Sequence, residues 1–313
     1  MGKQRVIKKP KRMRLRGRKL WFYICIVGLP LLQFAIFYVG VNINSFILAF
    51  RSYDYESGQY LFAGLSNFGK VFHDMGALPE LGIAFKNSFI VFFVSMAIGL
   101  TFALIFSYYI YKKFRGHRLF RIMLFLPFIV SNITMVILYK YFGENAVPAL
   151  IEKIFNVEVQ GLLSNYDTKF AYLLTFTILT SFGIQTLIYS GSMSGISESI
   201  TEAAKLEGIT PFKEFWYICV PMISPTIIVF ITTGFAGLFM NQMSIYSFYG
   251  QDPGDYSIYT IGYWLYQKIN SPEATLADYP YLSAFGLILT LFTAPITLLV
   301  RWGLQRLGRD SER

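Results

Sequence analysis

Six long runs of uncharged, mostly apolar residues constrain the fold of this 313-residue chain more than any other feature. A helix needs roughly 20 apolar residues to cross the ~30 Å hydrocarbon layer of a bilayer, where backbone groups cannot remain unpaired. Each run meets or approaches that length. The sequence therefore predicts an all-α membrane protein with six transmembrane helices, at residues 21–50, 87–111, 122–139, 170–196, roughly 221–248, and 279–300.

The composition agrees with this interpretation, because 54% of the residues are hydrophobic and only 15% are charged. Such a chain has too little polar surface to cover a soluble domain. We expect a basic tail at residues 1–20, one transmembrane domain at 21–305 and a short tail at 306–313. Pro30, Pro127 and Pro295 lie inside apolar runs and are expected to kink helices rather than end them.

The distribution of charge predicts the orientation. With the N-terminus inside, the inner segments hold 21 Lys and Arg against 6 Asp and Glu, and the outer segments hold 7 against 12. The positive-inside rule then predicts that both termini lie in the cytoplasm. We expect the chain to be a multi-pass protein of the cytoplasmic membrane. Ten basic residues within 1–20 also fit a nucleic-acid or lipid-binding arm. We favour an orientation signal with incidental lipid attraction, and no nucleic-acid partner.

Enzyme chemistry is poorly supported by the sequence. His73 and His117 fall on opposite predicted sides of the membrane, and Cys25 and Cys219 form no disulfide or metal-binding pattern. No G-x-x-x-x-G-K-[ST] phosphate-binding loop occurs. We therefore expect no metal, no cofactor and no ATPase site in this chain.

The inner segment at about 197–221 is the most specific part of the sequence. Ser199 and Glu202 stand at capping-box spacing, which predicts a helix start. Ala203 and Ala204 favour helix and allow close approach of another surface, and Gly208 suits a left-handed helix end.

A second short helix is predicted after Gly208. Thr210 can cap it and Pro211 fits its first turn. Its apolar face would carry Phe212, Phe215 and Trp216 before the chain returns to the membrane at Pro221. An exposed helix pair with small residues and projecting aromatics indicates insertion into a partner, and a plain connector is the alternative.

This segment, with Glu202-Ala203-Ala204, Gly208 and Pro221, resembles the EAA loop of binding-protein-dependent ABC importer permeases. Arg115-Gly116 and Phe120-Arg121 followed by LFLPFIV look like the entry to the third span of sugar-type permeases. The chain departs from that pattern at two places. Gln251 and Asp252 replace glycines of a common turn, and Ser197 replaces a proline.

The resemblance implies a type I ABC importer permease fold of the maltose or oligosaccharide class. It also implies a second, related permease subunit, two ABC ATPase subunits that hydrolyse ATP, and an extracytoplasmic solute-binding protein. The ATPase would contact the EAA loop, and the resemblance assigns that role to Glu202, Ala203, Ala204, Gly208, Phe212 and Pro221.

Neutral polar residues inside the spans mark a candidate solute pathway, because polar groups in a bilayer usually face a bundle interior or a wet cavity. Thr177, Ser181 and Gln185 recur every four residues along one predicted helix. Hydrogen bonding between helices is the alternative role for each residue. The candidates are Asn132, Thr177, Ser181, Gln185, Asn241 and Gln242, with Thr134, Thr180 and Ser244 beside them.

The neutral character of these groups predicts an uncharged sugar or polyol as solute. Two alternatives remain open: an ABC importer permease for an amino acid, polyamine or phosphate ester, and a membrane-embedded enzyme or secondary carrier with an accidental EAA-like loop.

Overall fold

Long apolar helices dominate the computed structural model, which describes the backbone of residues 17–310. Four helical segments are long and apolar enough to cross a bilayer: Trp21–Ala49, Pro79–Tyr111, Tyr166–Ser194 and Asp278–Arg306. The first comprises α1 (Gly17–Gln33), a π-helix η1 (Phe34–Gly40) and α2 (Val41–Ala49), and the others lie in α4 (Pro79–Tyr111), α8 (Tyr166–Ser194) and α15 (Asp278–Asp310). Pro30 and Pro295 lie inside helices that continue past them.

Two further segments qualify as spans only if bent pairs of helices are counted as one. The first pair joins α5 (His117–Ile129) to α6 (Asn132–Tyr141), η2 (Phe142–Ala146) and α7 (Val147–Phe155), with a bend of 103°. The second joins α10 (Pro211–Glu214), η3 (Phe215–Cys219) and α11 (Val220–Met222) to α12 (Ser224–Ala236), with a bend of 69°.

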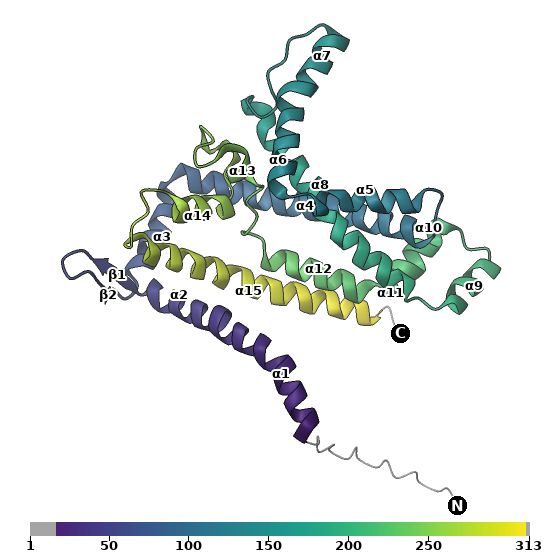
Figure 1. Cartoon of the computed structure of the whole chain (residues 1–313), viewed down its shortest axis with the longest axis horizontal. Coiled ribbons are helices and arrows are strands. Elements are labelled where there is room, and N and C mark those ends of the chain that lie inside the picture. The colour runs from purple at the N-terminus through teal and green to yellow at the C-terminus, as the bar shows by residue number, and fades with distance from the viewer. Residues whose placement is uncertain (1–16, 311–313) are drawn as a thin grey trace, which may run out of the picture.

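The third predicted span is therefore not one kinked helix. Pro127 was expected to kink the helix, but α5 ends two residues later and Val130 is extended, with φ −76° and ψ 141°. Ser131 then starts α6, since its Oγ accepts a hydrogen bond from the Thr134 amide at 3.3 Å. In Figure 1, α6 and α7 project away from the rest of the helices.

The fifth predicted span, 221–248, is also wrong as a continuous helix. The helix breaks at Ile223, α12 ends at Ala236, and Met243 and Ser244 take left-handed conformations before α13 (Ile245–Tyr249). A neighbouring side chain supports the irregular segment, because the Thr260 hydroxyl donates to the Asn241 carbonyl at 2.7 Å. This contact belongs to the start of α14 (Ile261–Asn270), which follows the 3₁₀ turn η4 (Tyr256–Ile258).

The segment after α2, which was predicted to lie outside, corrects the all-α prediction. Strands β1 (Arg51–Asp54) and β2 (Gln59–Phe62) form an antiparallel hairpin in which Tyr53 faces Tyr60. Their rings lie 5.2 Å apart, a cross-strand aromatic pair that stabilises the hairpin. Helix α3 (Ser66–Ala77) follows, so this outer segment is folded rather than an open loop.

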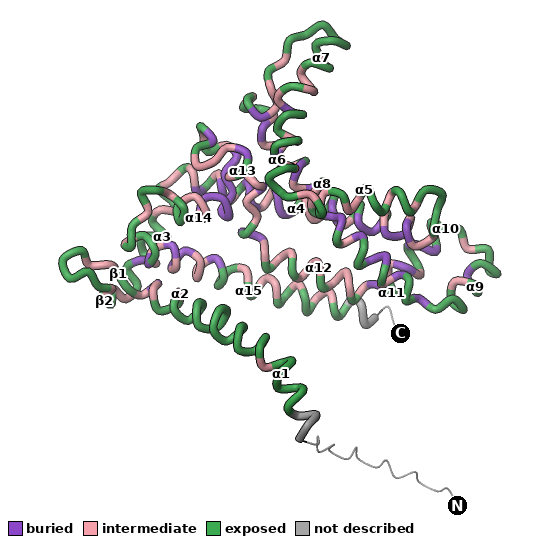
Figure 2. Tube along the Cα trace, viewed as in Figure 1, coloured by how far each residue is buried: buried purple, intermediate pink, exposed green. Residues whose placement is uncertain are grey.

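The buried residues form two groups along α4 and α8, which pack against each other over much of their length. In the orientation that the charge distribution predicts, the outer group contains Trp264 and Phe285, and the inner group contains Tyr189, Phe215 and Cys219. Figure 2 shows α1 and α2 exposed along most of their length. The inner group joins the 197–221 segment to the long helices.

Candidate functional site

The EAA-like segment forms two short helices, as predicted. Helix α9 (Glu198–Leu206) ends where Gly208 adopts φ 72°, the left-handed conformation expected of this glycine. The predicted start is wrong by two residues. Ser197 precedes the helix and Ser199 lies inside it, with their hydroxyls 2.8 Å apart and no side-chain cap from Ser197.

Several apolar side chains of this segment are exposed on the surface of the chain. Leu206, Tyr217 and Phe212 are 90%, 77% and 73% exposed, and with half-exposed Trp216 they form what we call the loop surface. Glu202 and Ala203 are exposed, whereas Ala204 is buried against the protein. Phe215 was predicted on the exposed face, but it is buried in the inner core.

A buried ion pair fastens this segment to α4. The Lys112 ammonium lies 2.7 and 2.8 Å from the two carboxylate oxygens of Glu214, and both side chains are largely buried. The Tyr108 hydroxyl donates to the Pro211 carbonyl at 2.9 Å, and its ring contacts Phe215. The Lys112–Glu214 pair, which we call the clamp, could not be predicted from the sequence because its partners are 102 residues apart.

A cavity of about 250 Å³ lies between α4, α8 and α12. It brings together three of the six predicted pathway residues, Ser181, Gln185 and Asn241. The remaining lining is apolar or aromatic with two more hydroxyl groups: Phe92, Ser95, Met96, Gly99, Leu100, Tyr189, Phe230, Ile231, Gly234, Gly237 and Leu238.

Two hydroxyl groups of this cavity lack hydrogen-bond partners within the described residues. They are Ser95 Oγ and Tyr189 OH, and Tyr189 is fully buried. A buried polar group without a partner costs about 1–3 kcal/mol, so a polar ligand or water in the cavity would remove a real penalty. Sequence reasoning missed both residues, although Tyr189 extends the four-residue spacing of Ser181 and Gln185.

The other predicted pathway residues lie outside this cavity. Thr177 Oγ1 donates to the Leu173 carbonyl of its own helix at 3.0 Å. Residues four positions apart are offset by about 40° around a helix, and the offsets add up along the helix. Thr177 therefore lies on a different face from Gln185 and Tyr189. Asn132 is exposed at the start of α6, and Gln242 lies in the irregular segment.

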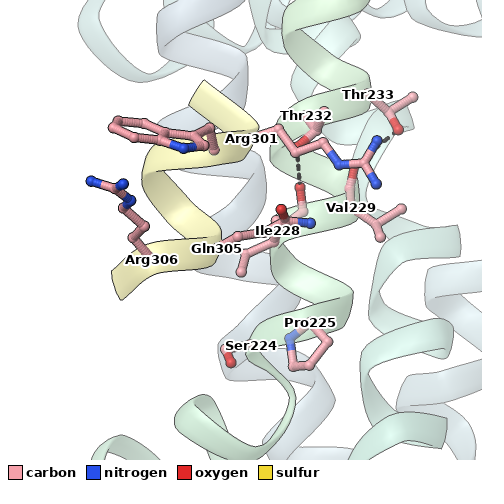
Figure 3. Close-up of a pocket in the computed structure, with 10 residues that line it drawn as sticks. Ser224, Pro225, Ile228, Val229, Thr232, Thr233, Arg301, Gln305 and Arg306 are labelled. Atoms are coloured by element: carbon pink, nitrogen blue, oxygen red, sulfur yellow. Dashed lines mark hydrogen bonds between the residues drawn. The ribbon is translucent and has the colours of Figure 1, made fainter. Parts of the chain in front are cut away.

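A larger cavity of about 770 Å³ lies between α12 and the inner end of α15. Figure 3 shows Arg301 extending from α15 toward α12, with Thr232 and Thr233 opposite. Both threonine hydroxyls donate to carbonyls of their own helix. We place the candidate pathway in the smaller cavity, because predicted polar residues and unpartnered hydroxyls meet there and not in the larger one.

A second ion pair organises the outer end of α8. Lys169, which is buried, pairs with Asp255 of the segment before α14. Burial raises the pKa of the Asp255 carboxyl, but the Lys169 ammonium and the Ser257 hydrogen bonds outweigh it, and the net pKa is lowered. Asp255 therefore stays ionised, and the ion pair holds the segment before α14 against the end of α8.

Helices long and apolar enough to span a membrane, a cavity among them that hydroxyl and amide groups line in part, and an exposed two-helix loop fit a membrane transport protein. The chain belongs to the family described as binding-protein-dependent transport system inner membrane component, which matches residues 95–312. This family comprises permease subunits of ABC transporters, so the chain is a multi-pass membrane protein of that class.

Two curated relatives show the level of similarity. The "Probable ABC transporter permease protein MG188" of Mycoplasma genitalium is 26% identical over 52% of this chain, and the match spans about half (51%) of that relative. The lactose transport system permease protein LacF of Rhizobium radiobacter is 26% identical over 76% of this chain and 79% of the relative.

Solved structures show the same fold. A chain of a bacterial ABC transporter involved in the import of the acidic polysaccharide alginate has a TM-score of 0.76 and 17% identity, covering 92% of this chain and 96% of its own. A second structure, of the alginate transporter in complex with an alginate pentasaccharide-bound periplasmic protein, has the same TM-score and 16% identity, over 95% and 99%.

Proposed function

We propose that this chain is the permease subunit of a type I ABC importer and forms half of the pathway for an uncharged sugar or oligosaccharide. The cavity between α4, α8 and α12 carries the proposal, since hydroxyl and amide groups line it, two of the hydroxyls are buried without partners within the described residues, and the chain belongs to a family of transport permeases. Neutral hydrogen-bonding groups and aromatic faces can replace the water contacts of a sugar.

The lining of this cavity favours a neutral solute. No charged side chain is among the described residues that line it. An amino acid, a polyamine or a phosphate ester would lose its hydration without gaining a countercharge, which is costly inside a membrane. A polyhydroxylated neutral solute carries no such cost.

The same proposal includes six spans with both termini in the cytoplasm. The charge asymmetry of the sequence supports this topology, since the positive excess lies in the segments that would face inside. A second permease subunit completes the pathway, and an extracytoplasmic solute-binding protein delivers the solute to the outer face.

ATP is bound and hydrolysed by two separate ATPase subunits that contact the loop surface. Exposed Leu206 and Phe212 would be covered by the ATPase, because apolar side chains of this size on one cytoplasmic loop favour a protein contact. Glu202, Ala203, Ala204, Gly208 and Phe212 lie in this loop, and Pro221 leads it back to the membrane.

Uptake by variants of the cavity tests the proposal. Tyr189→Phe and Gln185→Leu keep side-chain size but remove hydrogen-bonding groups, so the KM for sugar uptake should rise at least about tenfold in the double variant. Thr177→Val is the matched control, because it removes a polar group from the same helix outside the cavity. Equal uptake kinetics in the unaltered chain, the double variant and the Thr177→Val control would refute the assignment of the cavity.

A further inference from the structure

A second polar cavity, of about 360 Å³, lies at the inner ends of α4, α5 and α8 and takes no part in the proposed pathway. Its described lining combines four basic side chains with three hydroxyl groups and two apolar residues: Lys113, His117, Arg118 and Arg121; Tyr111, Ser190 and Ser194; Ile110 and Ile122. No acidic residue is among them. This volume lies within the range of small-molecule sites.

The basic groups of this cavity are left without countercharges. In the part of the chain whose side chains are described, no carboxylate lies within salt-bridge distance of Lys113, Arg118 or Arg121. The adjacent Lys112 does not belong to this set, because it is paired with Glu214.

The backbone holds this arrangement at a cost. Lys113 adopts a left-handed conformation with φ 54°, which is unfavourable for a residue other than glycine. Gly116, at φ 85°, then turns the chain into α5. Cations of like sign are thus gathered around one cavity, and an anion would relieve their mutual repulsion.

An apolar stripe continues from the cavity along α5. Ile122, Leu126 and Ile129 are spaced by four and three residues, so they lie on one side of the helix. They are 60%, 56% and 80% exposed. Because α5 leads from the basic inner segment into the predicted third span, the stripe runs for about 10 Å from the cavity toward the membrane interior.

We propose that this cavity binds the headgroup of an anionic glycerophospholipid, whose acyl chain lies along Ile122, Leu126 and Ile129. Phosphate oxygens accept hydrogen bonds from Arg118, Arg121 and Lys113, and the exposed stripe contacts hydrocarbon. A soluble phosphate would satisfy the cations but would leave the stripe uncovered. The site therefore selects lipids by charge and anchors the turn between α4 and α5.

Native mass spectrometry of the full-length purified chain tests this site by titration with phosphatidylglycerol or phosphatidylcholine of identical acyl chains. We expect tighter binding of the anionic lipid. In Arg118→Gln/Arg121→Gln that affinity should fall about 30-fold, while phosphatidylcholine binding stays unchanged. Lys113→Gln, a single exposed change, should give a smaller loss. The control Lys205→Gln/Lys213→Gln removes two exposed lysines outside the cavity and should bind as the unaltered chain does.

Four results would overturn the proposal. The first is equal affinity for both lipids in the unaltered chain, and the second is unchanged binding in the double arginine variant. The third is displacement of the lipid by glycerol phosphate at equal concentration, which would assign the cavity to a soluble anion. Leu126→Cys separates lipid from a protein contact: we expect a membrane-permeant maleimide to label this position in the purified chain and in the assembled importer alike, and protection in the assembled importer alone, which would show a protein interface, is the fourth result that would overturn the proposal.

Discussion

Removing one partner of the Lys112–Glu214 ion pair should release the 197–221 segment from α4. Their side chains are 19% and 5% exposed, so Glu214→Gln leaves a largely buried ammonium without its countercharge. Loss of one partner of a buried pair costs about 3–5 kcal/mol, and the partial exposure of Lys112 favours the lower value. A local cost of about 3 kcal/mol raises the open population roughly 100-fold.

Amide hydrogen exchange measures this opening directly, because it reports local free energies of unfolding. Exchange across residues 211–219 should accelerate by about that factor in Glu214→Gln, with little change in the transmembrane core. Lys112→Met/Glu214→Leu should recover much of the protection, since no charge is then buried. In reconstituted importer, Glu214→Gln should also lower the amount of solute moved per ATP hydrolysed.

The neighbouring substitution Lys213→Gln is the matched control. Lys213 is exposed on the same short helix and forms no ion pair within the described residues. If exchange in Glu214→Gln rises no more than in Lys213→Gln, the ion pair does not fasten the loop and the reasoning is refuted.

Three further predictions concern other parts of the chain. A Cβ at Gly183 would lie 2.7 Å from the Leu124 carbonyl oxygen and closer still to the Phe128 ring, whereas a Cβ at Gly191 would meet open space. Gly183→Ala should therefore lower the thermal unfolding temperature more than Gly191→Ala. Equal unfolding temperatures for the two variants would contradict this packing. Gly208→Val forces a β-branched residue to φ 72° and should weaken co-purification of the ATPase. If the variant keeps full ATPase association and full solute-stimulated hydrolysis, the loop is only a connector. Cysteines at Asp54, Asn156 and Glu273 should react with an impermeant reagent from outside, and protection of all three would overturn the topology.

Hydropathy and charge in the sequence were enough to predict a membrane protein with helical spans. Spanning a bilayer requires every backbone group to be bonded within the segment, so uncharged runs of this length leave few alternatives to helix. The left-handed end of α9 was predicted from Gly208 for an equally local reason, because a residue without a Cβ adopts that conformation at little cost.

The breaks within two spans could not be predicted in the same way. Val130 and Ser131 lie in an apolar stretch with no charge, and the irregular segment before α13 depends on α14 for its support. Gly262 shows why, since a Cβ there would lie 2.7 Å from the Met240 carbonyl oxygen. Only the close approach of α14 makes a non-helical backbone acceptable at that place.

The residues of the candidate site also fall into those that the sequence could predict and those that it could not. Spacing along α8 identified Ser181 and Gln185, because helical periodicity is a local property of the sequence. Ser95 lies on α4, and only the packing of α4 against α8 brings it to the cavity with Tyr189. The clamp between Lys112 and Glu214 likewise joins residues 102 positions apart. The sequence by itself determined the long apolar helices, the charge asymmetry and the two-helix loop around Gly208. The tertiary structure decided where two of the predicted spans break and which polar groups meet, because those features depend on how separate helices pack.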